Sequence, residues 1–135
     1  MLVPALLIID GNNVMGSRPD GWWRDRAAAT RRLVEQVAAW AAGADEAVVL
    51  VFDGRRPEGL EASAAVDVRF AERPGRNAAD DVIERLVADD PRPERVTVVT
   101  SDAGLAARVR VHGARVTGSR AFRDRLDGQS RSQPK

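Results

Sequence analysis

The stretch Ala5-Leu-Leu-Ile-Ile-Asp-Gly-Asn-Asn13 joins five apolar residues to a carboxylate and then to three turn-forming residues. A short apolar run that ends at glycine and asparagine is typical of a buried β-strand followed by a turn. Asp10 is therefore expected at the end of a strand. Because ligands of parallel sheets bind at the carboxyl ends of the strands, Asp10 is a candidate binding group. The alternative is that it only helps to build the turn.

Three further acidic motifs follow along the chain: Phe52-Asp-Gly54, Ala79-Asp-Asp81 and Ser101-Asp102. Two of these follow apolar runs, so their carboxylates are expected at the same sheet edge as Asp10. Several carboxylates in one place require a cation, and Mg²⁺ or Mn²⁺ prefers such oxygen ligands. The pattern thus predicts a metal site suited to hydrolysis of a phosphodiester. Alternatively, Asp53 begins a loop and Asp102 caps a helix.

Strand and helix signals alternate along the 135 residues. Apolar runs predict strands at residues 5–9, 47–52, 66–70, 96–100 and 114–117. Helical spacing and capping residues predict helices at about 24–42, 77–88 and 102–112, and a short one from Ser119. This alternation predicts an α/β fold with a parallel sheet covered on both faces. The length fits one domain, expected over residues 1–128, and the composition of 129–135 predicts a disordered tail.

The helix expected from residue 77 carries acids on two sides. At 100° per residue, Asp80 and Glu84 share one flank, and Asp81 points further out. The first turn of this helix is expected to bring Asp80, and with it Asp81, beside Asp10 and Asp102. Glu84 is an accessory candidate, as is Asp53. The alternative is that these acids merely complement the helix dipole.

Arginine supplies every basic residue except Lys135, in a chain whose net charge is only +1. Its planar guanidinium suits a bidentate grip on phosphate. Candidate contacts to the phosphates of a nucleic acid are Arg55 and Arg56 after the second motif and Arg73 and Arg76 before the third. The alternative is that the arginine content reflects the base composition of the genome.

Missing residue types exclude several classes of protein. Without an internal lysine the chain cannot be a P-loop, Schiff-base or receiver-type protein. Without cysteine it has no disulfide, thiolate nucleophile or zinc ribbon. The first apolar run is much shorter than the roughly 20 residues of a membrane span. We expect no membrane partner, and we expect a cytoplasmic location.

A few single residues remain as candidates. The amide of Asn12 can hold a carboxylate or a phosphate oxygen. Trp22 and Trp23 lie near the edge of Asp10, where they would either stack on unpaired bases or pack a helix onto the sheet. His112 falls at the end of a predicted helix, where capping is expected rather than catalysis.

Together these motifs resemble the NYN domain of the PIN-like nuclease superfamily, specifically its YacP-like branch. The matching segments, within residues 5–126, are Ile8-Ile-Asp-Gly-Asn-Asn-Val14, Val51-Phe-Asp-Gly54, Asn77-Ala-Ala-Asp-Asp-Val-Ile-Glu84, Val99-Thr-Ser-Asp102 and Gly113-Ala-Arg115 with Ser119. The resemblance implies a PIN-like three-layer α/β/α sandwich and a metal-dependent endoribonuclease that uses Mg²⁺ or Mn²⁺. It assigns the acidic positions to Asp10, Asp80 or Asp81, and Asp102, with Asn13 in support.

The chain departs from related 5′-nucleases at two acidic positions, where it has Ala78 and Gly104. With fewer ligands, the site would hold one metal firmly and a second only with substrate, or would bind RNA with little catalysis. A non-catalytic RNA-binding or adaptor module is therefore the alternative. A haloacid-dehalogenase-type phosphohydrolase is disfavoured because Asn12 replaces its second acid and its lysine is absent. RNA is the expected partner, and a ribosome-linked partner is a further candidate; the sequence does not specify the RNA or the oligomeric state.

Overall fold

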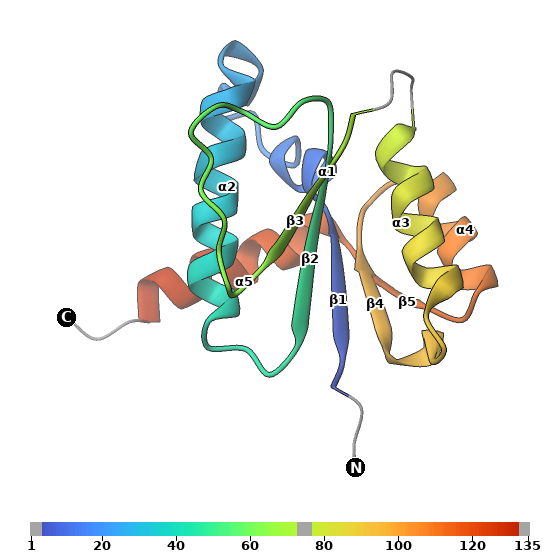
Figure 1. Ribbon diagram of the computed structural model, residues 1–135. Helices are drawn as coiled ribbons and strands as arrows, with labels where there is room; N and C mark the ends of the chain where they lie inside the picture. The colour runs from blue at the N-terminus through green and yellow to red at the C-terminus, as the bar shows by residue number, and fades with distance from the viewer. Residues whose placement is uncertain (1–3, 73–76, 133–135) are drawn as a thin grey trace.

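The sheet of the protein has five strands, all parallel, in the order β3-β2-β1-β4-β5 (Figure 1). The structure is a computed structural model that describes residues 4–72 and 77–132. The strands are β1 (Leu6–Asp10), β2 (Ala47–Asp53), β3 (Asp67–Ala71), β4 (Val96–Val99) and β5 (Arg115–Thr117). The five strands predicted from the apolar runs are confirmed, as is their parallel arrangement.

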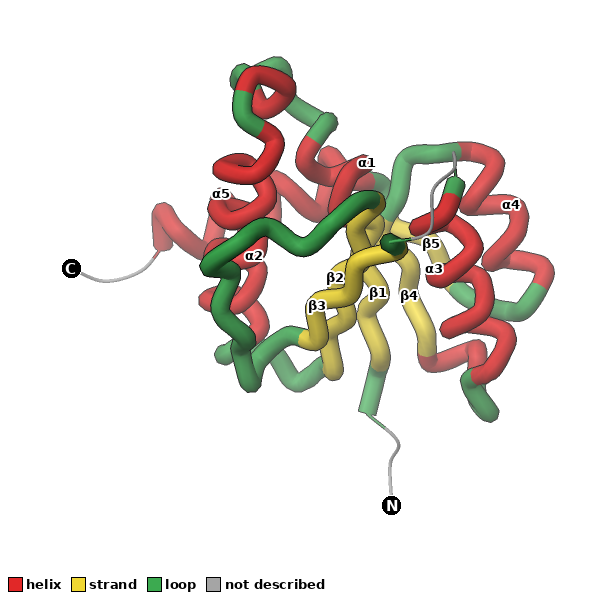
Figure 2. Tube along the Cα trace, turned by 45° about the horizontal axis from the view of Figure 1, so that its top comes forward, coloured by secondary structure: helices red, strands yellow, loops and turns green. Residues whose placement is uncertain are grey.

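Helices cover both faces of this sheet. They are α1 (Gly11–Met15), α2 (Arg26–Ala41), α3 (Ala78–Asp89), α4 (Ala103–Val111) and α5 (Ser119–Ser132), with short 3₁₀ turns at Trp22–Arg24 and Pro93–Arg95. Helices α1, α2 and α5 lie on one side of the sheet, and α3 and α4 lie on the other (Figures 1 and 2). The predicted three-layer α/β/α sandwich is confirmed. None of the helices described is long and apolar enough to cross a bilayer.

Two apolar layers hold the sandwich together, and β1 contributes to both. Leu7 and Ile9 pack with residues of α2 and α5, whereas Ile8 packs with residues of α3 and α4. Successive strand residues point to opposite faces, so a strand buried on both sides must be apolar throughout. β1 is therefore a central, fully buried strand, and it fixes the position of the carboxylate at its end.

Two elements differ from the sequence predictions. Residues 11–15 form a helical turn, α1, where only a turn was expected, because Asp10 caps it by accepting from the amide of Asn13. Gly11 is required there, since a Cβ atom would lie 2.5 Å from Cε1 of Phe52. Helix α5 continues to Ser132, into the segment 129–135 that was predicted to be disordered. Its polar composition concealed a helix that Phe122 and Leu126 anchor in the core, and residues 133–135 lie outside the described part.

Candidate active site

The register of the strands brings three acidic motifs to one edge of the sheet. Asp10 is aligned with Val51 of β2, and Ile9 is aligned with Val99 of β4. Asp53 ends β2, and Asp102 follows β4 by three residues. The chain order reverses between β1 and β4, and ligands of open α/β sheets bind at the carboxyl side of such a switch point. The predicted placement of these acids at strand ends is confirmed.

Asp10 is the most buried of the acids, with 5% of its surface exposed. Its Oδ2 accepts a hydrogen bond from Oγ1 of Thr100 at 2.9 Å, and its Oδ1 accepts from the amide of Asn13 at 3.4 Å. The pKa of Asp10 is raised from 3.8 to about 6, mainly by burial; the charges of Asp80 and Asp53 contribute to the rise, and the hydrogen bonds from Thr100 and Asn13 oppose it. The ionised carboxylate of Asp10 thus has a shortage of compensating positive charge around it.

Asp80, in the first turn of α3, shares this shortage. Burial is the main cause of its raised pKa, followed by the negative charge of Asp102 and, against it, the positive charge of Arg108. Asp53 also raises it. Among the residues that the structure describes, Asp80 has no hydrogen-bond partner. We call Asp10, Asp53, Asp80 and Asp102 the inner acids, because they stand at the strand ends and at the first turn of α3 and, among the described residues, none of them is hydrogen-bonded to an arginine.

Besides Asp10, which caps α1, two more of the inner acids cap helices. Oδ1 of Asp102 accepts from the amide of Leu105 at 3.0 Å at the start of α4, so the predicted cap is confirmed. Oδ1 of Asp53 accepts from the amide of Ala79 at 2.8 Å at the start of α3. Asn77 occupies the N-cap position of α3 with φ 69°, but its side chain makes no capping bond. Asp53 supplies that bond from β2, and it thereby fixes the helix turn that carries Asp80.

Amide and hydroxyl groups connect the strand ends beneath the acids. Oδ1 of Asn12 accepts from the amide of Asp53 at 2.6 Å. Oδ1 of Asn13 accepts from the amide of Ser101 at 2.8 Å and from Oγ of Ser119 at 2.5 Å. The two asparagines therefore tie the end of β1 to β2, β4 and α5, which is a positioning role.

Thr100 is a site residue that the sequence analysis did not identify. Its hydroxyl donates to Asp10 and accepts from the amide of Asp102 at 3.1 Å, so it links two inner acids. The available signal was a polar residue ending the apolar run of β4, directly before Ser101-Asp102.

Asp81 and Glu84 belong to a separate network between α3 and α4, and we call them the outer acids. Arg108 of α4 donates from Nη2 to Asp81 at 2.7 Å and from Nε to Glu84 at 2.6 Å. Nε2 of His112, at the C-cap of α4, lies 3.0 Å from the other Glu84 oxygen. The hydrogen bonds from His112 and then Arg108 lower the pKa of Glu84. Sequence reasoning placed Glu84 beside Asp80 and missed Arg108, which belongs to a different helix.

The inner acids do not form a finished metal centre. Within residues 4–72 and 77–132, no three acidic or histidine side chains stand together in a way that could hold a metal ion. The donor type, carboxylate oxygen, fits a hard divalent cation. Three of these carboxylates are engaged as helix caps through Oδ1.

Comparison with known proteins agrees with this fold. A family model, the YacP-like NYN domain, matches residues 7–135. The chain belongs to this family.

Two solved structures of Rae1 (YacP) from Bacillus subtilis are similar to this chain. One, a tryptophan-to-leucine mutant, has a TM-score of 0.75 and 23% identity, and the match covers 94% of this chain and 77% of that one. The other has a TM-score of 0.74 and 24% identity, with 93% and 75% covered. Their likeness is one of fold; no curated protein sequence matches.

In this YacP-like NYN domain, the two positions at which related 5′-nucleases have acids, Ala78 and Gly104, serve the packing of α3 and the capping of α4. Ala78 is buried in the apolar layer beneath α3, so its side chain belongs to the core. At Gly104, a Cβ atom would lie 3.2 Å from Oδ1 of Asp102. A larger residue there would crowd the Asp102 carboxylate.

The residues predicted to bind RNA fall in different places. Arg55 and Arg56 are exposed on the loop after β2, close to Asp53. Arg73 and Arg76 lie outside the described residues. Trp22 is partly buried and packs against the core, whereas Trp23 is 51% exposed. Trp22 therefore packs against the core, and the prediction that it also stacks on RNA bases is not tested by the structure.

Proposed function

We propose that this protein is a metal-dependent endoribonuclease that hydrolyses RNA phosphodiester bonds in the cytoplasm, on free or ribosome-bound RNA, with residues 1–128 as the nuclease domain. Family membership supports a nuclease. The observation that carries the proposal is the shortage of positive charge at the inner acids, where the pKa values of both Asp10 and Asp80 are raised. A divalent cation would satisfy that shortage.

In this proposal Asp10, Asp80 and Asp102 hold Mg²⁺ or Mn²⁺, and Asp53 assists. A bound divalent cation lowers the pKa of a coordinated water and neutralises charge on the phosphate. The Thr100 hydroxyl and the Asn13 amide donate to the Asp10 carboxylate and keep it in place, and the Thr100 hydroxyl also accepts from the backbone amide of Asp102. The proposed products carry a 5′-phosphate and a 3′-hydroxyl, because His112 pairs with Glu84 instead of serving as a base.

A non-catalytic RNA-binding module is the second candidate, and one observation favours it. Asp53 and Asp102 each direct a carboxylate oxygen to a helix N-terminus, so a purely structural use of these acids is complete without a metal. The arginines alone would then bind RNA.

A cleavage assay separates the two candidates. The purified chain is incubated with end-labelled single-stranded and structured RNA in Mg²⁺, in Mn²⁺ or in EDTA. The nuclease proposal predicts internal cuts that require the metal and yield 5′-phosphorylated fragments. Stable binding of RNA without any metal-dependent cut would instead establish the binding module.

A further inference from the structure

An open pocket of about 370 Å³ adjoins the inner acids on the α2 side of the sheet. We call it the arginine pocket, after the residues that matter among those lining it: Arg26, Arg55, Arg56, Asn12, Asp53 and Phe70. Asn12 and Asp53 also belong to the acidic edge, where the Asn12 side chain accepts from the Asp53 amide. Asn12 and Asp53 therefore belong to both the pocket and the acidic edge, so an RNA strand bound in the pocket would continue to the inner acids.

The three arginines of this pocket are exposed, and none forms an ion pair with a residue that the structure describes. Arg26 lies over the ring of Trp22 at 5.8 Å, and Arg56 lies over the ring of Phe70 at the same distance. Arg55 has neither a hydrogen bond nor an ion pair among the described residues. Arg95 and Arg108, by contrast, are each held by a carboxylate. The arginine pocket thus concentrates positive charge that carboxylates do not neutralise.

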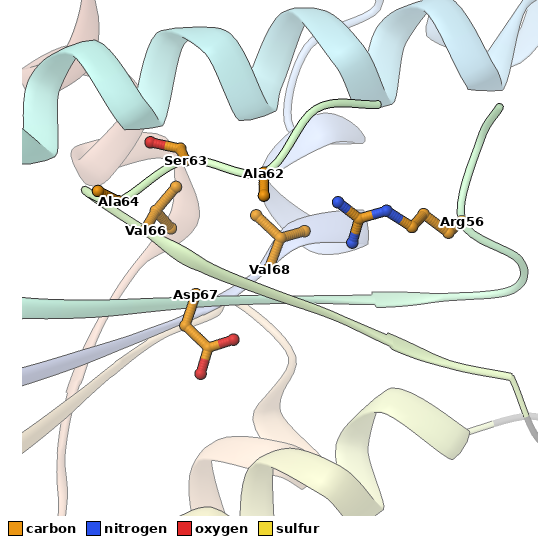
Figure 3. Close-up of a pocket in the computed structure, with 7 residues that line it drawn as sticks. All are labelled: Arg56, Ala62, Ser63, Ala64, Val66, Asp67 and Val68. Atoms are coloured by element: carbon orange, nitrogen blue, oxygen red, sulfur yellow. The ribbon is translucent and has the colours of Figure 1, made fainter. Parts of the chain in front are cut away.

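The loop that carries two of these arginines is fixed to its surroundings. Nη2 of Arg31 on α2 donates to the carbonyl oxygen of Glu58 at 2.8 Å, and Nη2 of Arg56 donates to that of Leu60 at 3.3 Å. Figure 3 shows Arg56 reaching from this loop toward Ala62 and Val68, into a second cavity of about 320 Å³. Arg56 lines both cavities and stands between them, so its guanidinium is held near the arginine pocket before any ligand arrives.

We propose that the arginine pocket binds the phosphate and ribose of the nucleotide next to the bond that is cut in a single-stranded RNA. This inference rests on the proposed function for the position of the cut. Guanidinium groups grip phosphate through paired hydrogen bonds, and a pocket of this volume is at the small end of the range for small-molecule sites, which suits one nucleotide. The Asp53 carboxylate is turned toward the amide of Ala79, which weakens its repulsion of a phosphate.

The test measures RNA binding without cleavage. A fluorescent 12-nucleotide single-stranded RNA is titrated in EDTA at several salt concentrations with the parent and with Arg26→Ala/Arg55→Ala/Arg56→Ala. Removal of charge-assisted hydrogen bonds should weaken binding by about tenfold or more. The slope of log affinity against log salt should become shallower by about 0.7 for each phosphate that the variant no longer neutralises.

The matched control is Arg85→Ala/Arg92→Ala/Arg110→Ala, which removes the same charge from exposed arginines elsewhere. It should bind RNA much more tightly than the pocket variant, and circular dichroism should show that both variants are folded. The proposal is overturned if the pocket variant binds like the parent, if the control is weakened as much, or if the parent binds no RNA in EDTA.

The outcome for the pocket is separate from the outcome for the nuclease. A parent that never cuts RNA with Mg²⁺ or Mn²⁺, but whose binding depends on the pocket arginines alone, supports the pocket and rejects the nuclease. A pocket variant that binds and cuts like the parent rejects the pocket and leaves the nuclease standing.

Discussion

The inner acid Asp80 and the outer acids Asp81 and Glu84 lie within about one turn of each other on α3, yet the inner and outer acids have opposite electrostatics. Burial and mutual repulsion raise the pKa values of Asp10 and Asp80, whereas partners lower that of Glu84. The difference comes from what each carboxylate faces. The outer acids face Arg108, and the inner acids face one another, hydroxyls and backbone amides. An acid at the start of a helix is a candidate metal ligand only when no basic side chain nearby pairs with it.

The shortage of positive charge at the inner acids is tolerated because the scaffold beneath them is rigid. Asp10 ends the central strand, which is buried on both faces, and Thr100 and Asn13 fix its oxygens. Repelling charges persist only where the surrounding structure determines their positions. A cation at this edge would therefore stabilise the fold as well as supply chemistry.

The largest expected effect is that of Asp10→Asn on cleavage. Loss of a ligand should reduce the rate by more than the roughly 100-fold typical of removing an outer partner of a metal ligand. The fold should survive, because the amide is neutral and can still bond to Thr100. Cleavage in Mg²⁺ and thermal melting of parent and variant test this. A variant that cuts as fast as the parent would remove Asp10 from the inner site, and one that melts much lower would show that its cap for α1 is its main role.

Most of the fold, and the edge to which the acids converge, could be predicted from the sequence. The apolar runs define strands buried on both faces, and the strand ends then set the position of Asp10, Asp53 and Asp102. The division between inner and outer acids could not be predicted. It depends on Arg108, which follows Glu84 by 24 residues, and pairing between side chains of two helices leaves no periodic signal. The role of Thr100 was hidden for the same reason, since its hydroxyl bonds across strands.

A second prediction concerns the pH dependence of stability without metal. A pKa of about 6 in the folded state against an ordinary 3.8 means that the folded protein binds this proton more tightly. The resulting stability is fully present below pH 3.8 and is lost as the pH rises through 6, by about 3 kcal/mol. Urea denaturation in EDTA from pH 4.5 to 7.5 should show that the free energy of unfolding of Asp10→Asn rises relative to that of the parent as the pH rises. A difference that stays constant with pH would mean that Asp10 is ionised normally, and saturating Mg²⁺ should narrow the difference at pH 7.5.

Asp80 and Asp81 offer a direct comparison, because they are neighbours on one helix turn. Asp80→Asn should slow cleavage by about as much as removal of a metal ligand, 100-fold or more. Asp81→Asn should slow it by less than about tenfold, since that carboxylate binds Arg108. Both substitutions remove one negative charge, so each controls for the other. Measured rates for the two variants at saturating Mg²⁺ decide the matter, and equal losses would erase the boundary between inner and outer acids.

The smallest effect is expected for Arg108→Gln, which removes the partner of the outer acids. Ion pairs that are partly exposed add little stability, so the melting temperature should fall by no more than a few degrees. Arg108 also lowers the pKa of Asp80, and without it Asp80 should stay protonated to a higher pH. Cleavage should therefore fall more at the acidic end of a pH–rate profile than at its alkaline end. Arg110→Gln, on the same helix and exposed, should leave that profile unchanged. A loss that is equally deep at every pH would instead mean that Arg108 contacts the RNA, and that the outer network is part of the substrate site.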